Sequence, residues 1–81
     1  MNLKEEIAQA IKQEPILLFM KGTPEMPRCG FSNQVVQILN YYGVPYTAVD
    51  VLADPEIRVE LSRQSGWPTI PQLFVKGQLV G

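Results

Sequence analysis

Apolar residues recur at helical spacing near the start of the chain, and from residue 16 to residue 20 every position is apolar. The first pattern predicts a helix that Asn2 is suited to cap, with Glu5 reaching back to the cap. Its apolar face consists of Leu3, Ile7, Ala10 and Ile11. Pro15 ends this helix. Residues 16–20 are all apolar, which is typical of a central strand covered on both faces.

A second helical pattern follows a loop with two prolines at residues 21–28. This helix begins at or beside Cys29 and ends at Gly43, where a positive φ is needed. The apolar residues that repeat along it are Phe31, Val35, Ile38, Leu39 and Tyr42. Residues 46–51 are rich in strand-forming types, so the strand-helix-strand order predicts two parallel strands joined by a right-handed crossover.

The third predicted helix has clear signals at both ends. Asp54 and Pro55 form an N-cap and first-turn pair, and Gly66 stops the helix. Ile57 and Leu61 supply its apolar edge.

Residues 67–71 contain too many prolines for regular structure. Beyond them, residues 72–75 and 78–80 flank Lys76 and Gly77, which suit a two-residue turn between antiparallel strands. The chain is therefore predicted to be an α/β protein with the element order αβαβαββ.

Composition limits the classes of protein that the chain can represent. Its 81 residues suffice for one domain only, spanning 1–81, and 46% of them are hydrophobic. A net charge of −1 with scattered signs argues against a nucleic-acid partner. The longest apolar run, residues 16–20, is too short for a signal core or a membrane span. We expect a soluble protein of the cytoplasm or another reducing compartment.

The chain contains one cysteine and no histidine, which excludes Cys-His and Ser-His nucleophile pairs. Cys29 stands where free helix N–H groups and the helix dipole stabilise a thiolate, lowering its pKa below about 8.5. Lys21 and Arg28 are expected to lower it further. The alternative is a buried cysteine that acts as a small hydrophobic residue. Ser32 occupies the position of the second thiol of a Cys-x-x-Cys motif, so no disulfide can form within the chain.

Two motifs resemble those of a known family. Lys-Gly-Thr-Pro at 21–24 leads into Cys-Gly-Phe-Ser at 29–32, and residues 67–72 read Trp-Pro-Thr-Ile-Pro-Gln. With the element order, these motifs resemble the thioredoxin fold and, more specifically, monothiol glutaredoxins of the Cys-Gly-Phe-Ser type. The resemblance covers essentially the whole chain. It implies a thioredoxin-like fold, in which a βαβ unit is followed by a helix and a ββ hairpin.

The sequence departs from that family after Gly81. A second glycine, a small residue or cysteine, an aspartate and the closing C-terminal helix are absent from it. The family's aspartate is the expected partner of the ammonium group of glutathione, so we expect weaker glutathione retention and a labile cluster. Without the closing helix, an apolar face of the sheet is expected to lack its cover, which favours self-association.

The resemblance implies two uses of Cys29, which the residues alone do not separate. If Cys29 is a metal ligand, the Cys29 thiolates of two chains and the thiolates of two glutathione molecules supply the four ligands of a 2Fe-2S cluster that bridges a homodimer. The cluster is then passed to iron-sulfur acceptor proteins, with BolA-type proteins as further partners. As a nucleophile, Cys29 reduces protein-glutathione mixed disulfides, as a weak enzyme at most. A third possibility is an adaptor that acts only through protein partners.

The resemblance also implies a glutathione site. Lys21 and Arg58 are the cations expected at the glutathione carboxylates, and the guanidinium of Arg58 can bind bidentately. Arg58 has the alternative of an ordinary solvated charge on a helix. A cis bond between Ile70 and Pro71 is expected to turn the backbone of Ile70 outward, where glutathione adds like a short strand with Thr69 beside it. Trp67 either shapes the cluster surface or caps the core.

Overall fold

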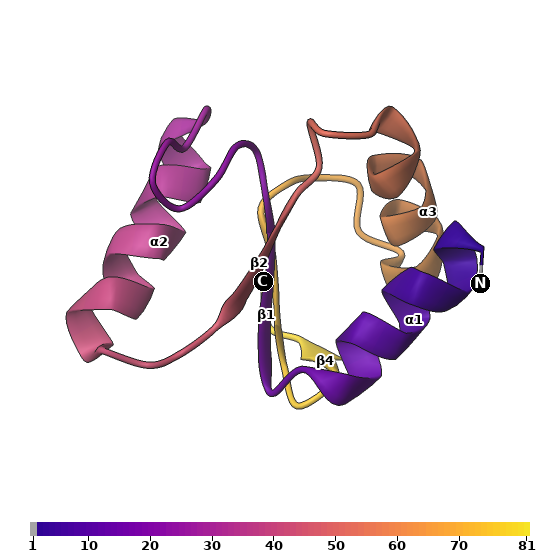
Figure 1. Cartoon of the computed structure of the whole chain (residues 1–81), viewed down its shortest axis with the longest axis horizontal. Coiled ribbons are helices and arrows are strands. Elements are labelled where there is room, and N and C mark those ends of the chain that lie inside the picture. Colours follow the sequence, from indigo (N-terminus) through magenta and orange to yellow (C-terminus); the bar gives the residue numbers. More distant parts are fainter. Residues whose placement is uncertain (1) are drawn as a thin grey trace.

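A computed structural model describes residues 2–81, and it forms one four-stranded sheet flanked by three helices (Figure 1). The elements run in the predicted order αβαβαββ. They are α1 (Leu3–Gln13), β1 (Ile16–Met20), α2 (Gly30–Tyr42), β2 (Thr47–Asp50), α3 (Pro55–Ser65), β3 (Gln72–Val75) and β4 (Gln78–Leu79). The predicted α/β fold class is therefore confirmed.

The strands lie in the order β2-β1-β3-β4, so β1 is an interior strand, as its apolar sequence predicted. β1 pairs in parallel with β2, with Leu17 opposite Thr47. It pairs antiparallel with β3, with Leu17 opposite Phe74. β4 continues the antiparallel part through the turn at Lys76 and Gly77, and both of these residues have positive φ, of 50° and 81°.

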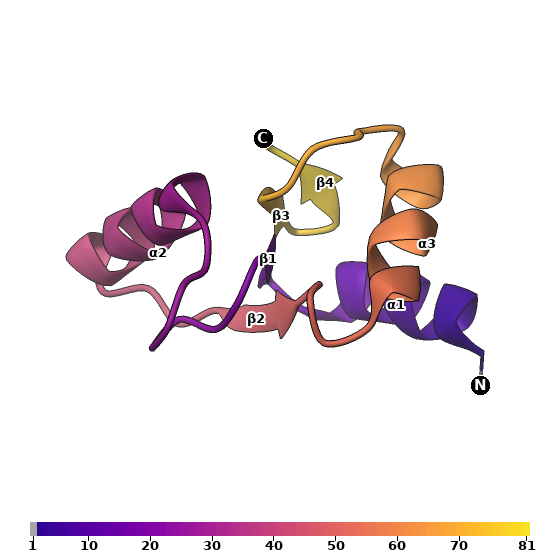
Figure 2. The same ribbon diagram turned by 90° about the horizontal axis from the view of Figure 1, so that it is seen from above.

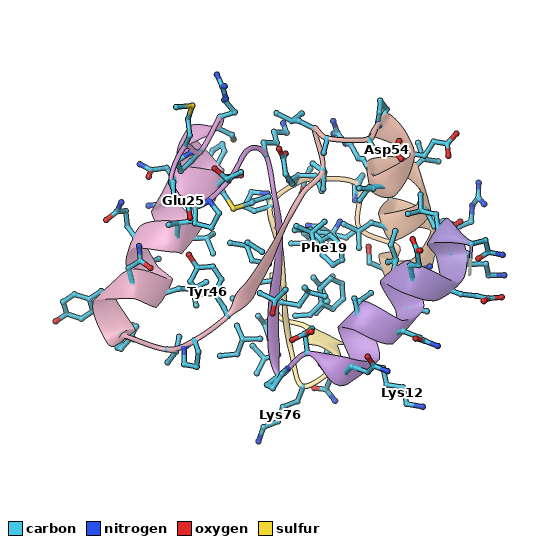
Figure 3. The ribbon with its side chains drawn as sticks, viewed as in Figure 1. Lys12, Phe19, Glu25, Tyr46, Asp54 and Lys76 are labelled. Carbon is cyan, nitrogen blue, oxygen red and sulfur yellow. The ribbon has the colours of Figure 1, made fainter. Side chains whose placement is uncertain are left out.

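The helices cover the two faces of the sheet unequally. α1 and α3 lie side by side on one face, and α2 lies on the other (Figures 1 and 2). The α1/α3 face contains the larger cluster of buried side chains, in which the rings of Phe19 and Phe74 meet edge to face at 5.8 Å. Figure 3 shows Phe19 in this layer and Tyr46 on the α2 side. On the α2 side, Leu73 of β3 remains half-buried.

The helix ends follow the predicted caps. Asn2 Oδ1 accepts a hydrogen bond from the Glu5 N–H at 2.9 Å, and Asp54 Oδ1 accepts one from the Glu56 N–H at 3.0 Å. α2 ends at Gly43, whose φ of 67° is left-handed, and Gly66 ends α3 with a φ of 71°. These local signals mark where α1 and α3 begin and where α2 and α3 end.

The buried face of α2 agrees with the prediction only in part. As predicted, Leu39 is buried and Val35 packs partly buried against the core. Val36 is buried although it was not predicted, whereas Phe31, Ile38 and Tyr42 are 70%, 52% and 72% exposed. Apolar residues occur on several sides of this helix, so their spacing alone does not determine which stripe faces the sheet.

None of the helices within residues 2–81 has the length and apolar character needed to cross a lipid bilayer.

The larger core cluster can be tested by a substitution at Leu61, whose side chain is fully buried where α3 packs against the sheet. We expect Leu61→Ala to lower the free energy of unfolding by about 2–5 kcal/mol, since it removes apolar contacts and leaves a cavity. Val59→Ala is the matched control on the same helix, because Val59 is 60% exposed. Its expected effect is within about 0.5 kcal/mol. Urea denaturation measures both, and equal effects would contradict the assigned core.

Candidate functional site

Cys29 is the N-cap residue of α2 and is partly exposed. Its backbone is extended, with φ −147° and ψ 138°, and its carbonyl accepts the first helical hydrogen bond, from the Asn33 N–H at 2.9 Å. The expectation of a reachable sulfur at the helix start is thus confirmed. The alternative of a cysteine buried as a hydrophobic residue is not supported.

The first turn of α2 favours the ionised form of Cys29. The backbone N–H of Ser32, followed by that of Phe31, lowers the pKa of the Cys29 thiol. The charge of Lys21 and the hydroxyl of Ser32 act in the same direction, and partial desolvation opposes them. Arg28 was expected to contribute as well, but it is exposed and is not among the groups that lower this pKa.

The loop before Cys29 is a closed hairpin. The N–H of Arg28 donates to the carbonyl of Lys21 at 2.8 Å, and Gly22 forms a bridge with Pro27. At the tip, the N–H of Met26 donates to the carbonyl of Thr23 at 3.0 Å. These bonds hold both ends of the loop together beneath the cysteine.

Gly22 allows this hairpin to close. Its φ is 91°, and a Cβ placed there would lie 2.5 Å from the carbonyl oxygen of Met26 and 2.9 Å from the nitrogen of Arg28. Both neighbouring atoms belong to the backbone and cannot move aside easily. Glycine is therefore required by the close approach as well as by the positive φ.

Two side chains attach the hairpin to the rest of the fold. Ser32 Oγ accepts a hydrogen bond from the Lys21 N–H at 3.1 Å, and Ser32 is fully buried. Asp50 Oδ1 accepts from the Gly22 N–H at 2.9 Å and from the Leu52 N–H at 2.8 Å. The carboxyl end of β1 is thus bonded to the first turn of α2 and to the end of β2.

The segment before β3 contains the predicted cis bond between Ile70 and Pro71. Ile70 is buried in the core cluster, whereas Thr69 and Trp67 are exposed, Trp67 to 48%. Gln72 anchors this segment, since its Nε2 donates to the carbonyls of Trp67 at 2.8 Å and Thr69 at 3.1 Å.

The two predicted cations differ in their relation to Cys29. Lys21 is half-buried, directly follows β1, and is near enough to influence the Cys29 pKa. Arg58 is an exposed residue of α3, and no hydrogen bond or salt bridge within residues 2–81 joins it to the cysteine loop. α3 nevertheless begins at the end of the molecule where β1 leads into that loop (Figure 1). The roles of both cations remain predictions.

Sequence reasoning missed two supporting residues, Asp50 and Gln72. Asp50 has one local signal, because an aspartate that accepts from the N–H two residues later forms a common turn at the end of a strand. Its bond to Gly22 spans 28 positions and has no local signature. Gln72 belonged to a recognised motif, but its sequence position does not show that its side chain is buried.

The reactivity of Cys29 provides a direct test of its ionisation. We expect the rate of alkylation by iodoacetamide to rise with pH around a lower midpoint in the folded chain than in the urea-unfolded chain. Since the folded pKa is lowered, ionisation adds stability above the unfolded pKa, and this gain is lost as the pH falls through the folded pKa. The free energy of unfolding of Cys29→Ser should lack this dependence on pH. Identical midpoints in the two states would contradict the assignment.

Asp50 can be tested with a pair of variants. Asp50→Ala leaves the Gly22 and Leu52 N–H groups without their acceptor, so we expect a loss of about 1–3 kcal/mol in the free energy of unfolding. Asp50→Asn keeps an acceptor oxygen in the same place and should lose less. Urea titration distinguishes them, and equal losses would show that the charge of Asp50, rather than its acceptor, stabilises the loop.

Comparison with known proteins identifies the family of this chain. The glutaredoxin family model matches residues 16–80. An uncharacterized monothiol glutaredoxin, ycf64-like, of Synechocystis sp. is 54% identical over 78 residues, which cover 96% of this chain and 73% of that protein. Glutaredoxin 4 of Escherichia coli K12 is 52% identical over 77 residues, covering 95% of this chain and 67% of the relative.

A solved structure agrees with the fold. The solution structure of a monomeric truncated mutant of Trypanosoma brucei 1-C-Grx1 matches with a TM-score of 0.89 and 43% identity. The match covers 100% of this chain and 74% of that one. The thioredoxin-like fold is therefore that of glutaredoxins, and the chain belongs to the glutaredoxin family, among its monothiol members.

Proposed function

We propose that this chain binds glutathione and shares a 2Fe-2S cluster with a second copy of itself, for transfer to iron-sulfur acceptor proteins. The observation that carries this proposal is a single reachable thiol at a helix N-terminus, with buried Ser32 where a second thiol would stand. BolA-type proteins are proposed as further partners, and a reducing compartment such as the cytoplasm as the location. Membership of the glutaredoxin family supports the glutathione requirement.

The ligand count supports a shared cluster. Across residues 2–81, no group of three or more His, Cys, Asp or Glu side chains is placed to hold a metal ion. Cys29 is the one thiol of the chain, whereas a 2Fe-2S cluster takes about four thiolate ligands. Two chains and two glutathione molecules supply that number, and the lowered pKa of the Cys29 thiol favours the thiolate form that binds metal.

The proposed glutathione site lies between the cysteine hairpin and the segment before β3. Lys21 would pair with a glutathione carboxylate, because its ammonium group already influences the Cys29 sulfur electrostatically. Arg58 would bind the other carboxylate from α3. Thr69 and Ile70 would contact the peptide backbone of glutathione in the manner of an added strand.

The closed hairpin before Cys29 supports cluster binding over fast disulfide chemistry. Its bonds from Arg28 to Lys21 and from Gly22 to Asp50 fix the loop against β1 and β2. We propose that the fixed loop directs the glutathione sulfur toward the shared cluster rather than into line with Cys29.

A second candidate function is favoured by the lowered Cys29 pKa. In that reaction the Cys29 thiolate attacks the glutathione sulfur of a mixed disulfide, and the protein thiolate leaves. The new bond between Cys29 and glutathione is then broken by a second glutathione thiolate, which releases glutathione disulfide and restores Cys29. Ser32 cannot resolve the intermediate, so this activity depends on external glutathione and is expected to be weak.

Anaerobic reconstitution with iron, sulfide and glutathione separates the two functions. We expect visible absorbance from a bound cluster in the wild-type chain, and its loss in Cys29→Ser or when glutathione is omitted. Ala8→Ser is the control, since Ala8 is exposed on α1 and the substitution keeps the single thiol. Cluster absorbance that persists in Cys29→Ser would contradict the proposal. Steady reduction of a glutathione mixed disulfide without any cluster formation would favour the second function.

A further inference from the structure

Gln72 is a polar residue at a fully buried position. It is the first residue of β3, pairs with Phe19 of β1 and is fully buried. Its Oε1 is buried without a hydrogen-bond partner among residues 2–81. Leaving a buried acceptor unpaired costs stability, and a methionine of similar size would avoid that cost. The carboxamide must therefore contribute something that an apolar side chain lacks.

The contribution comes from the nitrogen of the carboxamide. Gln72 Nε2 lies 2.8 Å from the Trp67 carbonyl oxygen and 3.1 Å from the Thr69 carbonyl oxygen. Both neighbours are acceptors, so the end of the side chain that meets them is the NH₂ group, which has two donors to give. Gln72 thus draws two carbonyl groups of one exposed segment inward.

This anchor determines where the Ile70 N–H points. The bond between Thr69 and Ile70 is trans, and the C=O and N–H of a trans peptide unit point in opposite directions. Because the Thr69 carbonyl points at Gln72, the Ile70 N–H points away from it, to the opposite side of the segment. Within the described part of the chain, this N–H donates to no backbone or side-chain acceptor.

We infer that Gln72 is a positioning residue for glutathione, which holds the Ile70 N–H free and correctly directed to pair with the peptide backbone of the ligand. The inference rests on the proposed glutathione site and adds to it a residue that does not touch the ligand. Gln72 acts only on this segment, since the groups that lower the Cys29 pKa belong to α2 and Lys21. Loss of the anchor should therefore weaken binding and leave the thiol unchanged.

Gln72→Met tests the inference, because methionine has similar length and volume but no donor. We expect glutathione to bind about tenfold more weakly, as the segment is no longer held in the paired orientation. The pH midpoint of Cys29 alkylation should not change. Gln9→Met is the matched control, since Gln9 is exposed on α1. Titration with reduced glutathione, followed by amide NMR shifts, gives the affinity of each chain.

A measurement on the wild-type chain keeps the test independent of the variant's folding. Hydrogen exchange should show slow Gln72 side-chain amide protons and a fast Ile70 N–H that becomes protected when glutathione is added. Equal affinity in wild type and Gln72→Met, or an Ile70 N–H already protected without ligand, would overturn the role of Gln72 alone. Failure of the wild-type chain to bind glutathione would overturn the proposed site, and this inference with it.

Discussion

The site depends on hydrogen bonds that hold the carboxyl end of β1 to two neighbouring elements, α2 and β2. The strand is buried on both faces, so it has little freedom to shift. Where it ends, the Lys21 N–H is bonded to Ser32 of α2 and the Gly22 N–H to Asp50 of β2. The cysteine hairpin therefore starts from a fixed point, and Cys29 reaches the N-terminus of α2 in a defined position.

This arrangement also shapes the chemical environment of Cys29. The N–H groups of Ser32 and Phe31 stabilise the Cys29 thiolate without any histidine to take the proton. Cys29 is the one thiol of the chain, and residues 2–81 contain no group of side chains placed to hold a metal ion. Under the proposed function, glutathione completes what the chain lacks, whether as a ligand or as the resolving thiol.

Most of the fold was predictable because its signals are local. Asn2 and Asp54 cap their helices as expected, and the turn at Lys76 and Gly77 joins the last two strands. The buried face of α2 was predicted only in part, since apolar residues lie on several sides of that helix. The supports of the site escaped prediction for another reason. The bond between Asp50 and Gly22 spans 28 positions and forms only when β1 and β2 lie side by side. Gln72 bonds to nearby residues, but nothing in the sequence shows that its side chain is buried.

The central claim is that Cys29 supplies only part of a ligand set that must be completed from outside the chain. Native mass spectrometry of the reconstituted protein tests this most directly, because it weighs every component of the assembly. The account predicts two chains, two glutathione molecules and one 2Fe-2S cluster in a single complex. A cluster carried by one chain, or by two chains without glutathione, would contradict it.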